Sequence, residues 1–206
     1  MGKQLTLSAS PHIHSGRTTS RVMLDVIIAL LPATIAGCVI FGLRALAVVA
    51  LTVASAVGFE ALFNLITKKK QTIGDLSAIV TGLLLALNLP ANVPLWQCVV
   101  GALFAIIVVK CLFGGLGCNI VNPAITARVF MLVAFGSMTK AALPTIVDTV
   151  AGATPLASEQ AVSLTDLLLG LHGGAIGETC AVALLVGFIY LLVRRVISWH
   201  LPVVFI

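Results

Sequence analysis

The sequence predicts an all-α, polytopic membrane protein, and three observations lead to this fold class. Hydrophobic residues make up 60% of the 206 positions and charged residues only 9%, far below the roughly 25% of an average soluble domain. Apolar runs recur along the chain. Several of them have a length close to the roughly 20 residues that a helix needs to cross a bilayer. The 12 Lys and Arg residues gather at a few sites, which reports membrane orientation and does not indicate nucleic acid. We therefore expect the lipid bilayer, and no nucleic acid, as a partner.

Six apolar runs are predicted to be spans, and a seventh begins without being completed. The six cover residues 22–41, 45–66, 76–89, 95–113, 120–135 and 179–193. The third and fifth are shorter than most and are flanked by helix-breaking residues. The seventh begins near Val196, and as a helix of roughly 12 residues it would extend about 18 Å, short of the hydrocarbon thickness. We expect that the chain is incomplete or that its end is buried in partners.

Basic residues predict the orientation of these spans. They precede the first span, follow the second and sixth, and lie near the end of the fourth: Arg17, Arg21, Lys68, Lys69, Lys70, Lys110, Arg194 and Arg195. If each run crosses once, all of them fall on one side, which the positive-inside rule makes cytoplasmic. The segment 136–178 then faces the exterior, and its charges agree, since Lys140 is its only strong base against four acidic residues.

These assignments divide the chain into four parts. Residues 1–21 form a cytoplasmic N-terminal arm, 22–135 a bundle of five spans, 136–178 an exterior loop, and 179–206 the sixth span with the start of the seventh. The exterior loop has room for a folded element outside the membrane, and residues 163–171 within it are typical of a short helix.

A broken or short helix is predicted near residues 114–123. Asn122 as the N-cap and Pro123 at the first helical position form a strong helix-start signal. The glycines before them, Gly114, Gly115 and Gly117, permit non-helical backbone at membrane depth, which is tolerated where it is buried or lines a cavity. Such a helix start would present free N–H groups to an anion or an electron-rich ring edge. The alternative is an ordinary turn between helices.

Ionisable residues within the spans are candidates for function because burying a charge in lipid is costly. Arg128, close to the start of the fifth span, could pair with a phosphate or with an acidic group on a neighbouring protein of a complex; the alternative is a side chain that snorkels to the headgroups. Asp25 and Glu60 could belong to an ion path, or could simply pair with the nearby Arg21 or Lys68. Lys110 is expected to snorkel.

Other site chemistries find no support in the sequence. The five cysteines show no C-x-x-C spacing, so no iron–sulfur or zinc site is predicted. His12 and His14 are too few for a metal site without further ligands. There is no P-loop, no dinucleotide fingerprint and no catalytic triad. We therefore predict no metal and no complete active site in this chain.

The exterior loop contains an unusually accessible threonine. Gly152 and Ala153 leave the hydroxyl of Thr154 sterically open, and Pro155 fixes the backbone after it. Asp148 supplies a polar group upstream. This motif resembles the flavinylation site of two related membrane proteins, the D subunit of the Rnf complex and the B subunit of the sodium-pumping NADH:quinone reductase. In those families the phosphate of FMN is esterified to the last threonine of the motif.

The resemblance to the D subunit of the Rnf complex extends over nearly the whole chain. The motifs that carry it occur in order, at residues 10–25, 30–33, 82–90 and 119–128. Two departures stand out: known D subunits have further C-terminal spans, and Ala151 stands where the family often has Ser or Thr. The long N-terminal domain of the quinone-reductase relative is absent, which favours the Rnf family.

The resemblance implies a membrane electron-transfer subunit of a ferredoxin:NAD oxidoreductase that couples redox energy to sodium or proton movement. Thr154 would carry covalent FMN, with Gly152, Ala153 and Asp148 shaping its surroundings and with Arg128 and Asn122 contributing to flavin binding. A riboflavin among the spans is a further implied cofactor, which the sequence does not place. The implied partners are the membrane and peripheral subunits of the Rnf complex and a flavin transferase, in a bacterial inner membrane.

Three alternatives remain open at this point. The chain could be a B-type subunit of a sodium-pumping NADH:quinone reductase. It could also be a solute channel or transporter without flavin, because such proteins likewise contain broken and short helices. A passive structural membrane subunit is the third alternative, and it predicts that Thr154 is unmodified.

Overall fold

The structure is a computed structural model that describes residues 18–69, 71–136, 142 and 164–200. Within this part of the chain every regular element is a helix, and one isolated β-bridge joins Ala142 to Gly174. The all-α prediction is therefore confirmed for the residues described.

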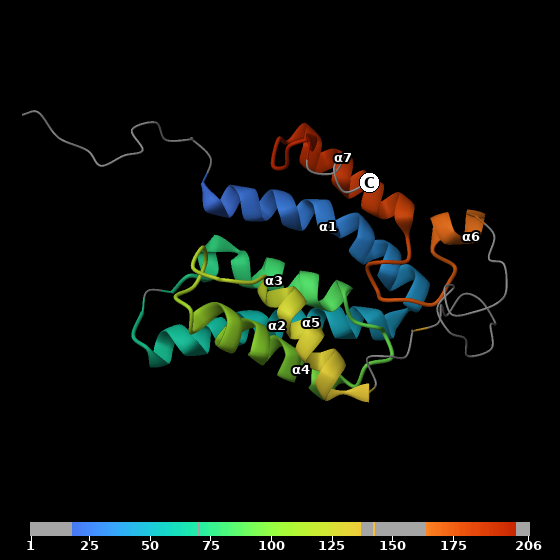
Figure 1. Cartoon of the computed structure of the whole chain (residues 1–206). Helices are drawn as coiled ribbons and strands as arrows, with labels where there is room; N and C mark the ends of the chain where they lie inside the picture. The colour runs from blue at the N-terminus through green and yellow to red at the C-terminus, as the bar shows by residue number, and fades with distance from the viewer. Residues whose placement is uncertain (1–17, 70, 137–141, 143–163, 201–206) are drawn as a thin grey trace, which may run out of the picture.

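Two long helices form the frame of the bundle. α1 (Thr19–Phe41) and α2 (Leu43–Ile66) run in opposite directions (Figure 1), and both are long and apolar enough to cross a membrane by length and composition. With 23 and 24 residues, each extends about 35 Å, more than the roughly 30 Å of bilayer hydrocarbon. The chain reverses at Gly42, whose φ of 72° favours glycine. The first two predicted spans are confirmed.

The remaining apolar helices are shorter than the prediction of full spans requires. They are α3 (Ser77–Leu87), α4 (Leu95–Leu103) with its π-helical continuation η2 (Phe104–Cys111), α5 (Pro123–Ala134) and α7 (Ala181–Val193). α3 has 11 residues and α5 has 12, so each extends only about 16–18 Å. All four lie at predicted positions, and the expected shortness of the third and fifth runs is confirmed. The prediction of six full spans is not confirmed.

Two small elements complete the described chain. η1 (Ile73–Asp75) precedes α3, and α6 (Leu164–Leu169) is the short helix expected within the exterior loop. The predicted seventh helix does not begin at Val196, because α7 ends at Val193 and Arg195 adopts a φ of 53°. Residues 194–197 and 199 form turns and bends, helical backbone is assigned again only at His200, and residues 201–206 lie outside the described part.

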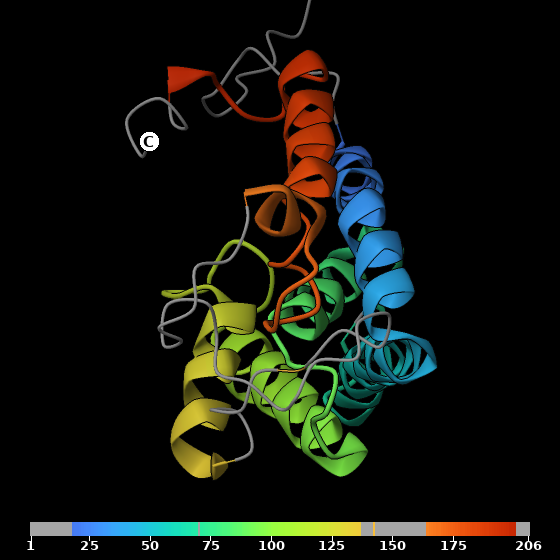
Figure 2. The same cartoon turned by 90° about the vertical axis from the view of Figure 1, so that its right-hand side faces the viewer.

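Small residues let the helices approach closely, as is usual in membrane bundles. α2 packs against α3 and α4, while α7 packs against α1 (Figure 2). A Cβ atom added at Gly82 would lie 2.9 Å from the Ala56 side chain of α2, and one added at Gly187 would lie 2.2 Å from the carbonyl oxygen of Ala29 on α1. These glycines therefore set the spacing of the two helix pairs.

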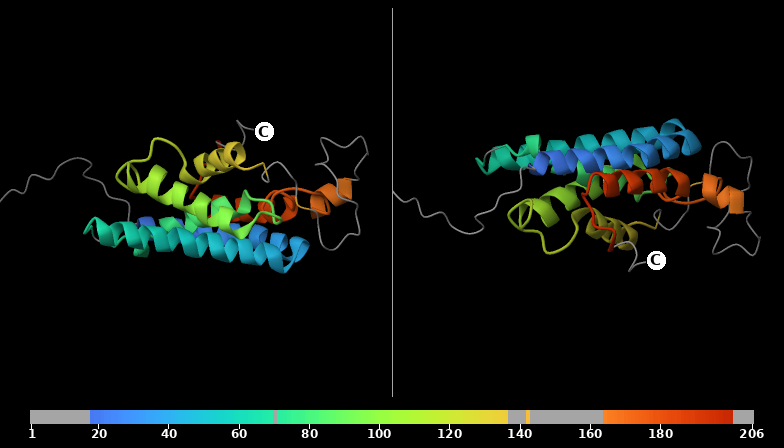
Figure 3. Two further views of the ribbon diagram at one scale, coloured as in Figure 1. Left: turned by 90° about the horizontal axis from the view of Figure 1, so that it is seen from below. Right: turned by 90° about the horizontal axis from the view of Figure 1, so that it is seen from above.

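The bundle has two chemically different ends (Figures 1 and 3). The basic end collects the start of α1, η1, residues 112–122 and the end of α7; a hydrogen bond of 3.1 Å from Ser20 Oγ to the carbonyl of Gly74 ties α1 to η1 there. The loop end collects the turn between α1 and α2, residues 88–94 and α6. Ala142 pairs with Gly174 of the segment after α6, which is itself hydrogen-bonded to Leu89 through Ile176.

Most of the described basic residues follow this division. Arg21 and Lys110 lie in elements that begin or end at the basic end, and Lys68, Lys69 and Arg194 follow helices that end there, as their clustering predicted. Arg44 is an exception that the charge pattern did not reveal, because it follows the turn at the loop end. Its guanidinium donates to the backbone carbonyls of Ala91 at 3.2 Å and Val93 at 3.4 Å, so it holds the 88–94 connection against α2.

Candidate functional site

The residues predicted to carry covalent flavin, Asp148, Gly152, Ala153 and Thr154, lie outside the described part of the chain. The nearest described residues on either side of them are Ala142 and Leu164. Ala142 is 3% exposed and its carbonyl accepts a hydrogen bond of 3.0 Å from Gly174 N, while α6 begins at Leu164. α6 lies at the loop end (Figure 1), and Ala142 is tied to the segment that follows α6 through Gly174.

The segment after α6 is tied into the core of the bundle. Ile176 N donates to the carbonyl of Leu89 at 3.0 Å, and Gly177 N donates to the carbonyl of Leu87 at 2.8 Å. A Cβ atom added at Gly37 would lie 2.3 Å from the carbonyl oxygen of Ile176, so glycine is needed where α1 passes this segment. Backbone hydrogen bonds and close packing thus hold the segment after α6 against α1 and the end of α3.

The predicted helix start at Asn122 is confirmed. The Asn122 Oδ1 atom accepts a hydrogen bond of 3.0 Å from Ala124 N, and Pro123 is the first residue of α5. The connection before it contains three glycines with positive φ, Gly114, Gly115 and Gly117. Asn122 lies at the basic end, so the 12 residues of α5, about 18 Å, separate it from the loop end (Figure 1). The structure therefore does not bring Asn122 together with the flanks of the Thr154 loop.

Arg128 lies within α5, between the two ends. Its side chain is partly buried and engaged in an interaction within the protein. Its proposed contact with flavin stays a prediction.

Lys110 and Glu60 form a buried ion pair, which corrects two predictions. Lys110 Nζ lies 2.7 Å from Glu60 Oε2, and the side chains are only 2% and 3% exposed. Lys110 therefore does not snorkel, and Glu60 does not pair with Lys68. The physical reason is that η2 packs against α2, so Lys110, in the last turn of η2, reaches the carboxylate on the neighbouring helix.

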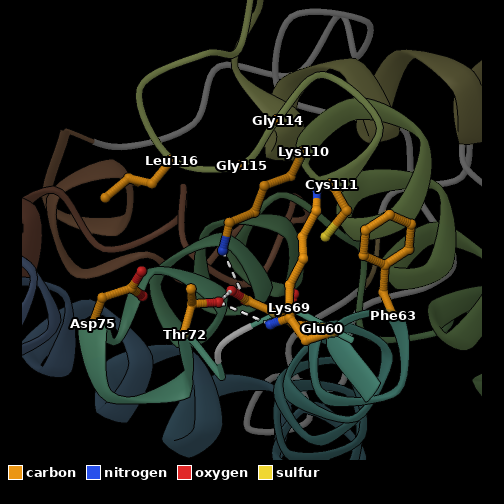
Figure 4. A pocket seen from close by; sticks show the side chains of 11 residues that line it. Glu60, Phe63, Lys69, Thr72, Asp75, Lys110, Cys111, Gly114, Gly115 and Leu116 are labelled. Carbon is orange, nitrogen blue, oxygen red and sulfur yellow. Dashed lines mark hydrogen bonds and ion pairs between the residues drawn. The ribbon is translucent and has the colours of Figure 1, made fainter. Parts of the chain in front are cut away.

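Hydroxyl and carboxylate groups extend this ion pair into a network, of which Figure 4 shows the part formed by Lys110, Glu60 and Thr72. Lys110 Nζ also donates to Ser77 Oγ at 2.6 Å, and Ser77 Oγ in turn donates to Asp75 Oδ1 at 2.6 Å. On the other side, the Thr72 hydroxyl donates to Glu60 Oε1. Leu76, between Asp75 and Ser77, has a φ of 64°, an uncommon conformation for a residue other than glycine. The turn before α3 thus places Ser77 against Lys110, with Asp75 directly behind it.

The network borders a cavity of about 270 Å³ at the basic end, which we name the carboxylate pocket. Its further lining residues include Phe63, Asn64, Lys69, Cys111, Gly114 and Gly115. Lys69 does not join the ion pair; its Nζ lies 5.7 Å from the centre of the Phe63 ring. The pocket therefore holds two carboxylates close to an internal ammonium group.

A second cavity of about 370 Å³ lies between the starts of α3 and α5, and we name it the interhelix pocket. Its polar lining residues are Ser77, Thr81, Lys110, Asn119 and Asn122. The Asn119 Oδ1 atom is buried without a hydrogen-bond partner among the described residues. Lys110 lines both pockets, so its side chain is part of the wall that they share.

Asp25 binds a residue that sequence spacing could not reveal. It accepts hydrogen bonds from Arg194 Nε at 3.1 Å and from the Tyr190 hydroxyl at 3.1 Å, so its partner is not Arg21. The hydrogen bonds to Asp25 raise the pKa of the Arg194 guanidinium. Because the Arg194 side chain is 54% exposed, solvent screens the pair, and its main effect is to attach the end of α7 to α1.

Comparison with known proteins identifies relatives of this chain. The chain is 49% identical to the D subunit of the Na(+)-translocating ferredoxin:NAD(+) oxidoreductase complex of Acetobacterium woodii, over 98% of this chain and 66% of the relative. It is 36% identical to the D subunit of the proton-translocating complex of Clostridium ljungdahlii, with the same coverage. The D subunit of the ion-translocating oxidoreductase complex of Cronobacter sakazakii is 34% identical, over 97% of this chain and 70% of the relative.

The chain thus spans about two thirds of the length of these relatives. The model of the NQR2, RnfD, RnfE family matches residues 6–206. The similarity therefore includes the arm, the described helices and the segment that contains Thr154, and the chain belongs to the NQR2, RnfD, RnfE family.

Proposed function

We propose that this protein is a D subunit of an Rnf-type complex, in which it carries flavin and takes part in electron transfer coupled to sodium or proton movement. The observation that carries the proposal is the continuous similarity to relatives named as D subunits of ferredoxin:NAD(+) oxidoreductase complexes. The first two helices support a location in the membrane by length and composition. The remaining subunits of the complex and the lipid bilayer are the proposed partners.

Thr154 is the proposed attachment point of FMN. A flavin transferase would form a phosphoester between the threonine oxygen and the phosphorus of an FMN unit supplied as a phosphoanhydride (a flavin dinucleotide). The phosphoanhydride bond would break, the nucleoside monophosphate would leave, and the hydroxyl proton would be released. The described flanks support an exterior position, because Ala142 and α6 lie at the end of the bundle opposite to Lys68 and Lys69. A covalent bond would keep the cofactor on the protein on the side where free FMN is scarce.

The interhelix pocket is the proposed site of a second, noncovalent flavin, the riboflavin that the family resemblance implies. Its volume of about 370 Å³ lies within the usual range of ligand pockets, roughly 300–1,000 Å³. The unpartnered Asn119 Oδ1 could accept a hydrogen bond from a ring N–H, and Lys110 could donate to a ring carbonyl. Asn122 would then belong to this site at the basic end, and Arg128, within α5, would lie between this site and the loop end. The bound flavin supplies the redox chemistry, and these residues bind and orient it.

Mass spectrometry of the intact chain tests the proposal. When the chain is produced together with a flavin transferase, we expect a mass increase that corresponds to one FMN joined as a phosphoester. Extraction of the same sample with acid should release riboflavin but leave the FMN attached. A chain without any flavin under these conditions would contradict the proposal. It would favour the two alternatives that need no flavin, a solute channel or a structural subunit.

A further inference from the structure

Arg44 lies where two general rules disfavour a cation. It is the second residue of α2, and the positive end of the helix dipole lies at a helix N-terminus. It also lies at the loop end, away from the end at which most of the described basic residues gather (Figure 1), and the proposed orientation places the loop end outside. A specific contact must therefore compensate for both costs.

The Arg44 guanidinium binds the backbone of the connection between α3 and α4. Its Nε atom donates to the carbonyl of Ala91 at 3.2 Å, and Nη2 donates to the carbonyls of Val93 at 3.4 Å and Asn92 at 3.5 Å. Ala91 and Val93 are only 5% and 0% exposed, and residues 88–94 consist of turns, bends and irregular backbone. Buried carbonyls outside regular structure need such donors, so Arg44 fixes the path of this connection beside α2.

The same connection holds the segment that follows α6. Ile176 N donates to the carbonyl of Leu89 at 3.0 Å, and Gly177 N donates to the carbonyl of Leu87 at 2.8 Å. The contact is close, since a Cβ atom added at Gly177 would lie 2.7 Å from the Cβ atom of Leu87. A shift of residues 88–94 would therefore move or release the backbone of residues 176–177.

This segment in turn binds the described residue that most closely precedes Thr154. Gly174 N donates to the carbonyl of Ala142 at 3.0 Å, and Ala142 is 3% exposed. On the other side of Thr154, α6 begins at Leu164 and runs directly into the same segment. One backbone segment thus holds both described flanks, and Arg44 stands at the start of the series of hydrogen bonds that fixes it.

We propose that Arg44 is a positioning residue for flavin transfer to Thr154, a role that rests on the proposed function. Through residues 88–94 and 174–177 it holds the two flanks in the arrangement that a flavin transferase recognises. An acceptor whose competent arrangement is populated only part of the time binds its partner with an affinity reduced by that fraction. Arg44 therefore determines the KM of the transferase for this chain and leaves kcat unchanged, because the bound acceptor is the same.

Transfer kinetics test this role. The full chain, produced without a transferase and purified in detergent, is incubated with the transferase and a flavin dinucleotide. For Arg44→Met we expect KM to rise roughly tenfold at constant kcat, because charged hydrogen bonds to the connection are lost. Arg44→Lys keeps the charge but lacks the fork that reaches several carbonyls, so its KM should be intermediate. Arg194→Met is the matched control, since it removes an arginine contact at the opposite end, and its KM should not change.

Amide hydrogen exchange of the same chains, before any flavin is added, tests the series of hydrogen bonds directly. Peptides that cover residues 171–180 should exchange faster in Arg44→Met than in the unmodified chain, because local opening becomes easier. Peptides that contain Gly114 and Gly115, at the basic end, should exchange at the same rate in both. Arg44→Gln, which keeps one donor group, is measured in the same way should Arg44→Met not fold.

The outcomes separate this role from the proposed function. An unchanged KM, a change in kcat at constant KM, or unchanged exchange in residues 171–180 would each overturn the positioning role. Failure of the Met, Gln and Lys variants of Arg44 to fold would also overturn it, because Arg44 would then serve the stability of the whole fold. Absence of transfer even to the unmodified chain would instead contradict the proposed attachment of FMN, while hydrogen exchange would still test the link from Arg44 to the flanks.

Discussion

Lys110 and Glu60 lie 50 positions apart in the sequence, yet their charged atoms lie 2.7 Å apart in the fold. The pair joins η2 to α2 at the basic end and brings the turn before α3 into the same network through Ser77. A single contact therefore links three elements that surround both pockets.

Removal of one member of this pair should destabilise the protein more than removal of both. Glu60→Leu leaves a buried ammonium without its carboxylate, and we expect a loss of about 3–5 kcal/mol in the free energy of unfolding. The double variant Glu60→Leu with Lys110→Met should recover most of this loss. Denaturant titration in detergent measures both values. A double variant as unstable as Glu60→Leu alone would show that the charges do not interact.

The glycine at the crossing of α1 and the 174–179 segment should tolerate no side chain. A Cβ atom at Gly37 would lie 2.3 Å from the backbone oxygen of Ile176, so Gly37→Ala should destabilise the protein by about 1–3 kcal/mol. Gly58→Ala is the matched control in α2, since nothing lies within 4 Å of its added Cβ, and it should be neutral or stabilising by up to about 1 kcal/mol. Equal unfolding midpoints for the two variants would refute the close approach.

The topology predicts opposite accessibility for the two ends of the bundle. With all five native cysteines replaced by serine or alanine, single cysteines are introduced as Ser158→Cys, in the exterior loop, and Gln71→Cys, at the basic end. A membrane-impermeant thiol reagent added to intact cells should modify only the cysteine at position 158. Permeabilised cells provide the control, because both positions should then react. Modification of position 71 alone in intact cells would reverse the orientation.

Arg128 should influence a flavin through its charge. Arg128→Leu removes a permanent cation from the middle of α5, and we expect a lower flavin midpoint potential because a nearby positive charge favours the reduced, more negative cofactor. Arg128→Lys keeps the charge and should retain most of the potential. Redox titration of the flavin absorbance in assembled complexes provides the measurement. An unchanged potential in Arg128→Leu would return Arg128 to a structural role.

Local signals predicted the fold well, and long-range contacts escaped prediction. The start of α5 followed from Asn122 and Pro123, because capping depends on neighbouring residues alone. The lengths of α3 and α5 were overestimated. The third predicted span included Asn88 and Leu89, which follow the end of α3 at Leu87, and the fifth began at Ile120, before the start of α5 at Pro123.

The ion pairs of Glu60 and Asp25 could not be read from spacing. Their partners lie 50 and 169 positions away, and nearby basic residues offered simpler pairings. The two pockets were equally hidden, because each combines side chains from several helices and connections. A lysine near the end of an apolar run gave no signal that distinguishes a buried network from a snorkelling side chain.

The attachment of FMN to Thr154 is the central claim, and in-gel flavin fluorescence tests it most directly. The Thr154→Val variant keeps the β-branched shape but lacks the acceptor oxygen, and Thr149→Val is the internal control within the same loop. After production with a flavin transferase, denaturing electrophoresis should show a fluorescent band for the unmodified chain and for Thr149→Val, and none for Thr154→Val at equal protein amount. A band that survives in Thr154→Val but disappears in Thr149→Val would contradict the assignment, and the absence of fluorescence from all three chains would contradict covalent flavin altogether.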